Sequence, residues 1–234
     1  MGEASVNEEF YARRTAARAR LDAIDPHKQP GGETADPQRK DWFEAVYRLA
    51  EDDPAGVPWA NLAPHPLLAS WLAGRRLAGR ALDVGCGLGD NAEALAAAGA
   101  SVCAFDLVEA AVLWAKRRFP ESPVDYRAAD LFAPPPEWRG AFDLVHECYT
   151  LQALPDALLD QAAPALAALV APGGTLLVVT RARDEGQHVA GPPWPLTKSR
   201  VEALAVDGLR LETLEDIPAT DVMVRHWRAA FVRA

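Results

Sequence analysis

The sequence has only three cysteines in 234 residues, and no two of them form a CxxC pair. Three cysteines cannot all pair, so Cys86, Cys103 and Cys148 predict no disulfide framework. The five histidines are also far apart in the sequence, whereas structural metal sites usually draw ligands from closely spaced pairs. The composition therefore indicates neither a disulfide-bonded secreted module nor a metal site.

Long hydrophobic runs are missing as well. Stretches such as AALVAPGGTLLVV, residues 167–179, are interrupted by proline and glycine, well short of the roughly 20 apolar residues that a membrane helix needs. The opening MGEASVNEEF is acidic and lacks the basic start and apolar core of a secretory signal. We therefore expect a cytoplasmic protein without a membrane segment.

Basic residues are not in excess, because the formal net charge is −9. Broad binding to nucleic acid draws its affinity from clustered Lys and Arg. The arginine-rich segment YARRTAARARL, residues 11–21, is read most simply as the solvated face of a helix. We expect a small molecule as partner and regard nucleic acid as unlikely, while the sequence leaves the oligomeric state open.

The length and a hydrophobic content of 50 % suit one catalytic-size domain with an appendage. A helix is predicted over residues 11–24, followed by the Pro- and Gly-rich segment 25–38, which reads as a linker. Residues 1–40 are thus expected to form an N-terminal helix and linker, either a lid or a tail. Residues 41–234 are expected to form the main domain.

From residue 80 onward, strand-like and helical segments alternate, which is typical of parallel strands joined by crossover helices. We predict strands at 80–86, 101–106, 124–130, 142–148 and 174–182, helices at 90–99, 108–119, 155–170 and 197–207, and a final pair of strands at 209–216 and 224–234. Gly99 is expected to end the first of these helices in a left-handed conformation. Pro164 is expected to kink or divide the third.

The segment ALDVGCGLGD, residues 81–90, lies where the first of these strands ends. Gly85, Gly87 and Gly89 remove side chains from the following turn, so that a ligand can approach the backbone N–H groups. The spacing G-x-G-x-G differs from the G-x-G-x-x-G of dinucleotide folds. The preceding Asp83 would repel a phosphate but suits a ligand with an ammonium group.

Two more acids end the next predicted strands. Asp106 closes the second strand, where its carboxylate can accept hydrogen bonds from both hydroxyls of a ribose. Asp130, followed by Leu131, closes the third strand, where it can accept a hydrogen bond from an adenine amino group. A nucleoside joined to an amino-acid tail describes S-adenosyl-L-methionine, which we predict as the cofactor.

With LDVGCGLGD, FDL and AADLF in order, residues 80–182 resemble the class I S-adenosylmethionine-dependent methyltransferases. The resemblance implies an α/β fold: a doubly wound, seven-stranded, mostly parallel sheet of the Rossmann-like methyltransferase type, here with an N-terminal helical extension. It also implies a cofactor site made of Asp83, Gly85, Cys86, Gly87, Gly89, Asp106, Leu107, Asp130 and Leu131.

A narrower resemblance lies outside this core. The segments GVPWANLAPHPLL, residues 56–68, and GPPWPLTKSRV, residues 191–201, are similar to flanking segments of the thiopurine, thiol, halide and tellurite methyltransferases. This resemblance implies that Trp59 lies against the cofactor and that Trp194 lines the acceptor pocket. Two core tryptophans in Pro-rich loops are the alternative.

The segment HECYT, residues 146–150, lies at the end of the fourth predicted strand. Thiopurine methyltransferases tend to have Asp-Arg where this sequence has Glu147-Cys148. An arginine that could steer an anionic acceptor is missing there. Glu147 is expected to hold the methionine ammonium, and strand alternation sends it to the face opposite His146. His146 is a candidate base, although a packing role is equally consistent, and Tyr149 is a candidate to orient the acceptor.

The function predicted from the sequence is methyl transfer from S-adenosyl-L-methionine to a small-molecule acceptor by in-line displacement. A sulfonium methyl group is already electrophilic, so positioning and exclusion of water supply most of the catalysis. The alternatives are a methyltransferase that acts on protein or nucleic acid, and a non-catalytic cofactor-binding module. HECYTLQ lacks the D/N-P-P-Y pattern common in nucleic-acid amino methylation. The acceptor and its methylated atom stay open.

Overall fold

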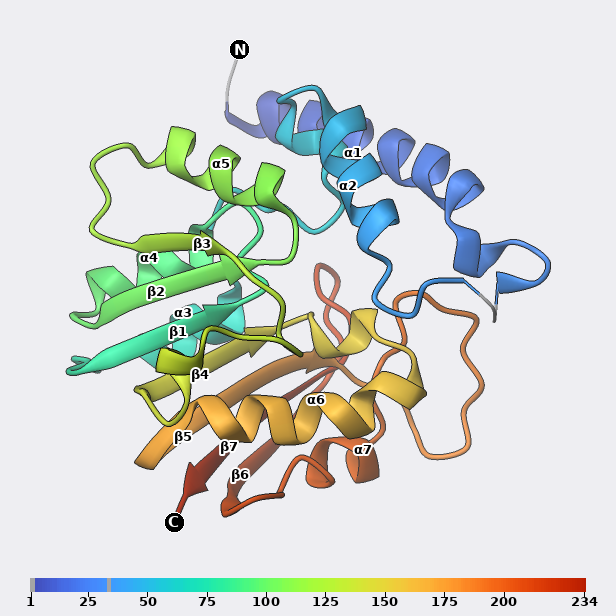
Figure 1. Ribbon diagram of the computed structural model, residues 1–234. Helices are drawn as coiled ribbons and strands as arrows, with labels where there is room; N and C mark the ends of the chain where they lie inside the picture. Colours follow the sequence, from blue (N-terminus) through green and yellow to red (C-terminus); the bar gives the residue numbers. More distant parts are fainter. Residues whose placement is uncertain (1–2, 33–34) are drawn as a thin grey trace.

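The computed structural model describes residues 3–32 and 35–234, so residues 1–2 and 33–34 of the predicted N-terminal helix and linker lie outside the described residues. Seven strands form one sheet in the order β3-β2-β1-β4-β5-β7-β6 (Figure 1). The strands are β1 Arg80–Val84, β2 Ser101–Asp106, β3 Asp125–Ala128, β4 Phe142–Cys148, β5 Val170–Arg181, β6 Leu209–Ile217 and β7 His226–Arg233. Only β7 runs antiparallel to its neighbours, which confirms the predicted doubly wound sheet.

Helices cover both faces of this sheet, as the alternation of strands and helices predicts. They are α1 Glu3–Ile24, α2 Lys40–Ala50, α3 Pro66–Leu72, α4 Asp90–Ala97, α5 Glu109–Arg118, α6 Asp156–Leu169 and α7 Lys198–Glu202, with 3-10 turns at Pro26–Lys28, Pro54–Gly56, Pro136–Trp138 and Leu151–Ala153. Figure 1 shows α6 in front of the sheet and α3 and α4 behind it.

The sheet has one apolar cluster on each of its two faces. Leu82 and Val84 of β1 point to the side of α6 and pack in the same cluster as Leu166. Ala81, one residue before Leu82, points to the side of α3 and α4, where it packs in the same cluster as Leu68 and Leu95. Because successive strand residues face opposite ways, Asp83 follows Ala81 to the α3 side.

The predicted helix boundaries need two corrections. Pro164 lies inside α6 without dividing it, because the apolar face of the helix, including Leu159 and Leu166, is buried against the sheet and keeps the helix in place. The last helix is shorter than predicted: Thr197 caps its first turn, and α7 ends at Glu202. Gly99 has a φ of 112°, as predicted for a residue that ends α4.

The N-terminal helix is longer than predicted and is packed on the rest of the chain. Ala17 and Leu21 of α1 are buried, and the helix contacts the Pro54–Gly56 turn. The segment that follows is also tied down, because Arg39 and Asp25 form a buried ion pair with 2.5 Å between Nη2 and Oδ2. The segment predicted as a linker therefore begins and ends at packed residues.

None of the helices in the described part of the chain is long and apolar enough to cross a membrane. Within residues 3–32 and 35–234, no group of His, Cys, Asp and Glu has the arrangement of a metal site.

Candidate active site

The glycine loop connects β1 to α4, and all three of its glycines have a positive φ, between 52° and 92°. A Cβ at Gly85 would lie 2.3 Å from Thr150 Oγ1, and one at Gly89 would lie 2.5 Å from the Tyr126 hydroxyl. These two glycines are required by close packing as well as by φ. At Gly87 a Cβ would meet the Trp59 ring at an ordinary 3.5 Å, so its left-handed conformation is the stronger requirement.

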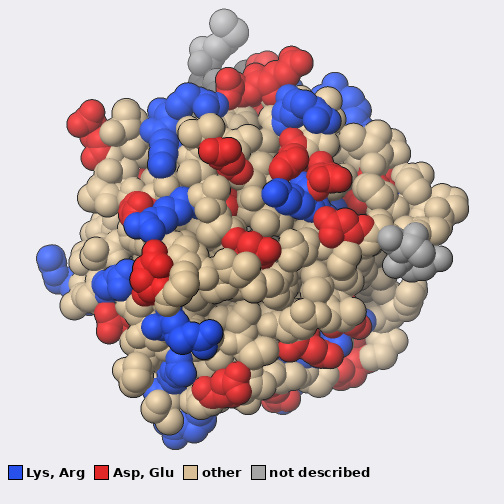
Figure 2. Space-filling model, in the orientation of Figure 1, with Lys and Arg blue, Asp and Glu red and all other residues tan. Residues whose placement is uncertain are grey.

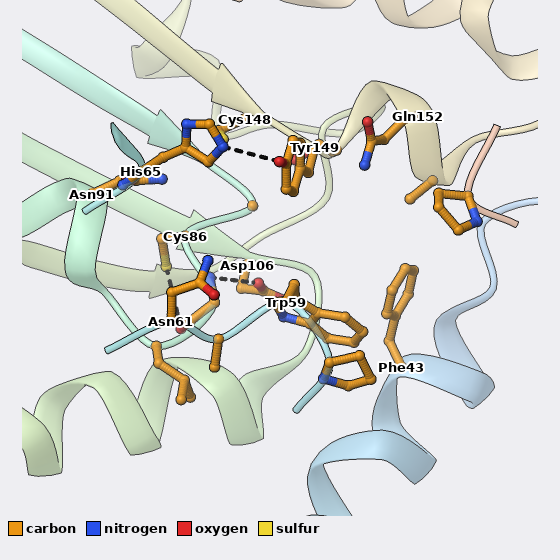
Figure 3. A pocket seen from close by; sticks show the side chains of 18 of the residues that line it. Phe43, Trp59, Asn61, His65, Cys86, Asn91, Asp106, Cys148, Tyr149 and Gln152 are labelled. Carbon is orange, nitrogen blue, oxygen red and sulfur yellow. Dashed lines mark hydrogen bonds between the residues drawn. The ribbon is translucent and has the colours of Figure 1, made fainter. Parts of the chain in front are cut away.

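Asp106 lies at the end of β2, directly beside this loop (Figure 3). Its Oδ2 accepts a hydrogen bond from the Gly87 N–H at 3.0 Å, and its Oδ1 accepts one from the Val108 N–H, also at 3.0 Å. Burial raises the pKa of Asp106 to about 6. Each oxygen keeps a lone pair for a further donor, so the carboxylate can still accept hydrogen bonds from ligand hydroxyls.

Asp130 follows β3 and is the next acid along the sheet edge. Its Oδ1 accepts a hydrogen bond from the Phe132 N–H at 2.9 Å, and its Oδ2 accepts one from Gln38 Nε2 at 3.4 Å. Leu131 beside it is buried. The glycine loop offers backbone donors, Asp106 can accept hydrogen bonds from ribose hydroxyls, and Asp130 with Leu131 can bind an adenine. These groups together fit a nucleoside such as that of S-adenosylmethionine.

These groups open into a cavity of about 970 Å³ at the carboxyl ends of the strands. The predicted site residues that line it are Trp59, Gly85, Cys86, Gly87, Asp106, Leu107, Asp130, Leu131 and Tyr149. The same cavity reaches α1, the end of β5 and the turn before β7. It therefore has room beyond the nucleoside for a second molecule.

Asp83 and His146 do not reach the cavity, contrary to their predicted roles. Their side chains are 2 % and 0 % exposed, and His146 Nδ1 lies 2.7 Å from Asp83 Oδ1. The two residues face each other on the adjacent strands β1 and β4. Strand alternation turns both under α3 and α4, so we no longer assign His146 as a base or Asp83 as a contact of the ammonium group.

Glu147 is also buried away from the cavity. Its Oε1 accepts a hydrogen bond from the Leu151 N–H at 2.9 Å, while Oε2 has no partner. Burial raises the pKa of Glu147 to about 8. Its predicted contact with the methionine ammonium is therefore wrong for this geometry, because the side chain points toward the turn that precedes α6.

Glu147→Gln is expected to stabilise the protein increasingly as pH rises. The folded state holds the proton of Glu147 up to a pH of about 8, whereas the usual pKa is 4.5. Unfolding therefore releases a proton between these values, and the wild type loses up to about 1.4 kcal/mol of unfolding free energy per pH unit relative to the variant. Urea unfolding between pH 5 and 8 measures the difference, with exposed Glu202→Gln as the control; parallel profiles for wild type and Glu147→Gln would contradict it.

Tyr149 follows β4 with a left-handed φ of 72°, and its hydroxyl lies between two histidines. His65 Nε2 is 2.9 Å and His226 Nε2 is 2.6 Å from the Tyr149 oxygen. Figure 3 shows the bond to His65 at the cavity wall. The sequence could not reveal this cluster, because its histidines are 84 and 77 residues away from Tyr149.

Backbone partners determine which nitrogen of each histidine carries the proton. His65 Nδ1 accepts from the Leu67 N–H, so Nε2 donates to Tyr149. His226 Nδ1 donates to the Val224 carbonyl, so Nε2 accepts from Tyr149. Burial, the largest cause, raises the pKa of Tyr149 to about 12. Tyr149 is therefore a phenol held in one orientation.

The two predicted tryptophans occupy different environments. Trp59 lines the cavity, and its Nε1 donates to the Tyr47 hydroxyl at 3.2 Å. Trp194 does not line the cavity; its ring packs edge-on against the His27 ring at 5.5 Å. The neighbouring residues Pro192 and Pro193 reach the cavity instead. The prediction that Trp194 contacts the acceptor is therefore wrong, because Trp194 contacts His27 in the segment after α1.

Arginines do line the cavity, although none follows β4. Arg181 ends β5, and Arg14 and Arg18 come from α1. An arginine for an anionic acceptor is therefore missing only at the end of β4, where the sequence has Glu147 and Cys148. Arg14 and Arg18 belong to the arginine-rich segment 11–21, which was expected to be a solvated helix face, so that expectation is corrected for these two residues, because they line the cavity. Arg181 belongs to no motif in the sequence.

Comparison with known proteins agrees with this geometry. Residues 81–174 match the family model of a methyltransferase domain. The ubiquinone biosynthesis O-methyltransferase of Bordetella avium (strain 197N) is 39 % identical over 127 residues, 52 % of either chain. The trans-aconitate 2-methyltransferase of Variovorax paradoxus (strain S110) is 32 % identical over 163 residues, 66 % of this chain and 58 % of that protein. The chain thus spans little more than half the length of these two curated relatives.

Solved structures share the fold at low sequence identity. The 1,6-didemethyltoxoflavin-N1-methyltransferase of Burkholderia thailandensis has a TM-score of 0.66 at 18 % identity, over 86 % of this chain and 91 % of that one. The N-methyltransferase NodS of Bradyrhizobium japonicum WM9 has a TM-score of 0.61 at 21 % identity, over 85 % and 99 %. The glycine loop, the strand order and the match over residues 81–174 together show a methyltransferase domain with the Rossmann-like fold of the class I S-adenosylmethionine-dependent enzymes.

Proposed function

We propose that this protein transfers the methyl group of S-adenosylmethionine to a small-molecule acceptor by in-line displacement. The observation that carries this proposal is one continuous cavity of about 970 Å³. Its lining includes the glycine loop and Asp106 as well as a second compartment around Tyr149. This volume is at the upper end of the range of small-molecule sites, enough for a cofactor and a modest acceptor together.

The cofactor half follows from the strand ends. Asp106 would accept hydrogen bonds from the ribose hydroxyls, and Asp130 would accept one from the adenine amino group between apolar neighbours. Trp59, beside Gly87, would cover the cofactor from the α2 side. Bound S-adenosylmethionine supplies an electrophilic methyl group, so the residues of this chain have to bind, orient and exclude water.

Three considerations support a small acceptor. The relatives are named for ubiquinone biosynthesis and for trans-aconitate, and a structural neighbour is named for 1,6-didemethyltoxoflavin. Helix α1 lines the cavity with Tyr11, Arg14, Arg18 and Asp22, and we propose that it acts as a lid. Figure 2 shows acidic and basic side chains interspersed on the face of the molecule that is also seen in Figure 1. That face has no continuous basic surface of the kind that a nucleic acid would need.

Membership of the thiopurine, thiol, halide and tellurite group is a narrower proposal. It is supported by the position of Trp59 at the cavity wall beside the glycine loop. Trp194 adds no support, because its ring packs on the His27 side.

Ligand-induced stabilisation tests the cofactor. S-adenosylmethionine and S-adenosylhomocysteine are expected to raise the melting temperature, because a ligand at 100 times its dissociation constant adds about 2.7 kcal/mol to the folded state. NADH is expected to have no effect. Turnover of labelled S-adenosylmethionine with pooled small metabolites, followed by mass identification of the product, tests transfer. A shift with NADH alone would overturn the proposal.

A further inference from the structure

The charged residues that line the cavity divide it into two halves. Asp106 and Asp130, at the ends of β2 and β3, face the cofactor half. The other acids of the lining are paired with bases: Asp22 with Lys28, Asp25 with Arg39, and Asp90 with Arg118. Among the cavity-lining residues that the structure describes, no acid is therefore left to neutralise a cation in the half around Tyr149.

That second half contains Arg181, which lies next to His226 in the β5–β7 register. Its guanidinium carbon is 5.5 Å from the centre of the Tyr149 ring, and its Nε is buried without a hydrogen-bond partner. The Arg181 N–H donates to Gln152 Oε1 at 2.7 Å, which anchors the end of the strand. Arg181 is thus a positioned cation at the cavity wall.

Arg14 and Arg18 approach the same space from α1. Among the described residues, no carboxylate forms an ion pair with Arg14, Arg18 or Arg181. Burial, the largest cause, lowers the pKa of Arg14, and the charges of Arg18 and Arg181 also lower it. Because uncompensated cations in a sheltered cavity repel one another, this half of the cavity favours an anion.

The described residues of the same half include no strong base for a neutral acceptor. Burial, then the charges of His226, His146 and Arg181, lower the pKa of His65 to about 3. Burial also lowers the pKa of His226, and Tyr149 remains a phenol with a pKa of about 12. An acceptor that arrives without a proton needs no base.

We propose that the methyl acceptor is a carboxylate held by Arg181, an inference that rests on the proposed methyl transfer. A guanidinium binds the two oxygens of a carboxylate with directed N–H donors. In the reaction, a carboxylate oxygen forms the bond to the methyl carbon while the methyl–sulfur bond breaks and its electron pair stays on sulfur. The products are a methyl ester and a neutral thioether, and no proton is transferred. Arg14 and Arg18 close the site from α1.

Calorimetry with the intact protein tests this in two steps. Binding of S-adenosylhomocysteine is measured first, and its absence would count against the proposed function rather than this inference alone. The binary complex is then titrated with benzoate, cinnamate, succinate and tricarballylate, each against its uncharged amide. At least one acid is expected to bind about tenfold or more tightly than its amide, the effect of a hydrogen bond to a charged group.

Three variants locate the effect. Arg181→Gln is expected to abolish the preference for acid over amide, Arg181→Lys to keep part of it, and Arg210→Gln, on the exposed edge strand β6, to keep all of it. The inference is overturned if the wild-type complex prefers no acid, or if the preference survives Arg181→Gln. The inference is also overturned if Arg181→Gln weakens the binding of S-adenosylhomocysteine tenfold, because Arg181 would then hold the cofactor.

Discussion

Asp106→Asn is expected to weaken S-adenosylhomocysteine binding by about 10- to 150-fold, corresponding to the roughly 1.5 to 3 kcal/mol of hydrogen bonds to a charged group. The carboxylate lies at the glycine loop and accepts hydrogen bonds from the N–H groups of Gly87 and Val108. An asparagine would present an amide N–H to one of these donors and would carry no charge. Calorimetric titration measures the loss, and Asp125→Asn, which lies outside the cavity lining, serves as the control.

The pH dependence of the same titration identifies the group. Burial raises the pKa of Asp106 to about 6 in the free protein, and ligand hydroxyls would donate to the ionised form. Below that pH the bound state requires loss of a proton, so wild-type affinity should fall about tenfold per pH unit. Asp106→Asn should show no such slope between pH 5 and 7. An equal slope in both proteins would assign the titration to another residue.

Breaking the buried ion pair between Arg39 and Asp25 is expected to have the largest effect on stability. Both side chains are at most 3 % exposed, and Arg39 stacks on the Trp42 ring at 4.1 Å. Arg39→Met would leave the Asp25 carboxylate buried without its partner, at a cost of about 3 to 5 kcal/mol. Because the pair links the end of α1 to the start of α2, we expect α1 to detach before the sheet unfolds.

Two measurements distinguish detachment from general unfolding. Limited proteolysis within residues 25–40 should accelerate in Arg39→Met, and urea unfolding should report the loss of stability. Arg117→Met, which removes an exposed ion pair with Asp52, should cost less than about 1 kcal/mol. The double variant Asp25→Leu/Arg39→Met should recover most of the loss, since two apolar side chains leave no buried charge. Equal proteolysis rates in wild type and Arg39→Met would show that the pair does not anchor α1.

The sheet was predictable because its information is local. The ends of β2 and β4 agree with the predicted ranges, since each strand is an apolar run bounded by turn residues. The glycine loop was equally predictable, because the positive φ values at Gly85, Gly87 and Gly89 favour glycine, which has no Cβ to oppose them. Local preference was overruled at Pro164, where burial of the helix keeps α6 continuous.

What the sequence by itself determined is therefore the order of the elements, the glycine loop and the acids at the strand ends. Only the tertiary structure decided which polar side chains face the cavity. Strand alternation places His146 under α3 and turns Glu147 to the opposite face, where it accepts a hydrogen bond from the Leu151 N–H. Tyr149 instead contacts His65 and His226, and Arg181 and Arg14 line the same cavity. These groups come from distant segments, and no local pattern records contacts that arise only when the helices close on the sheet.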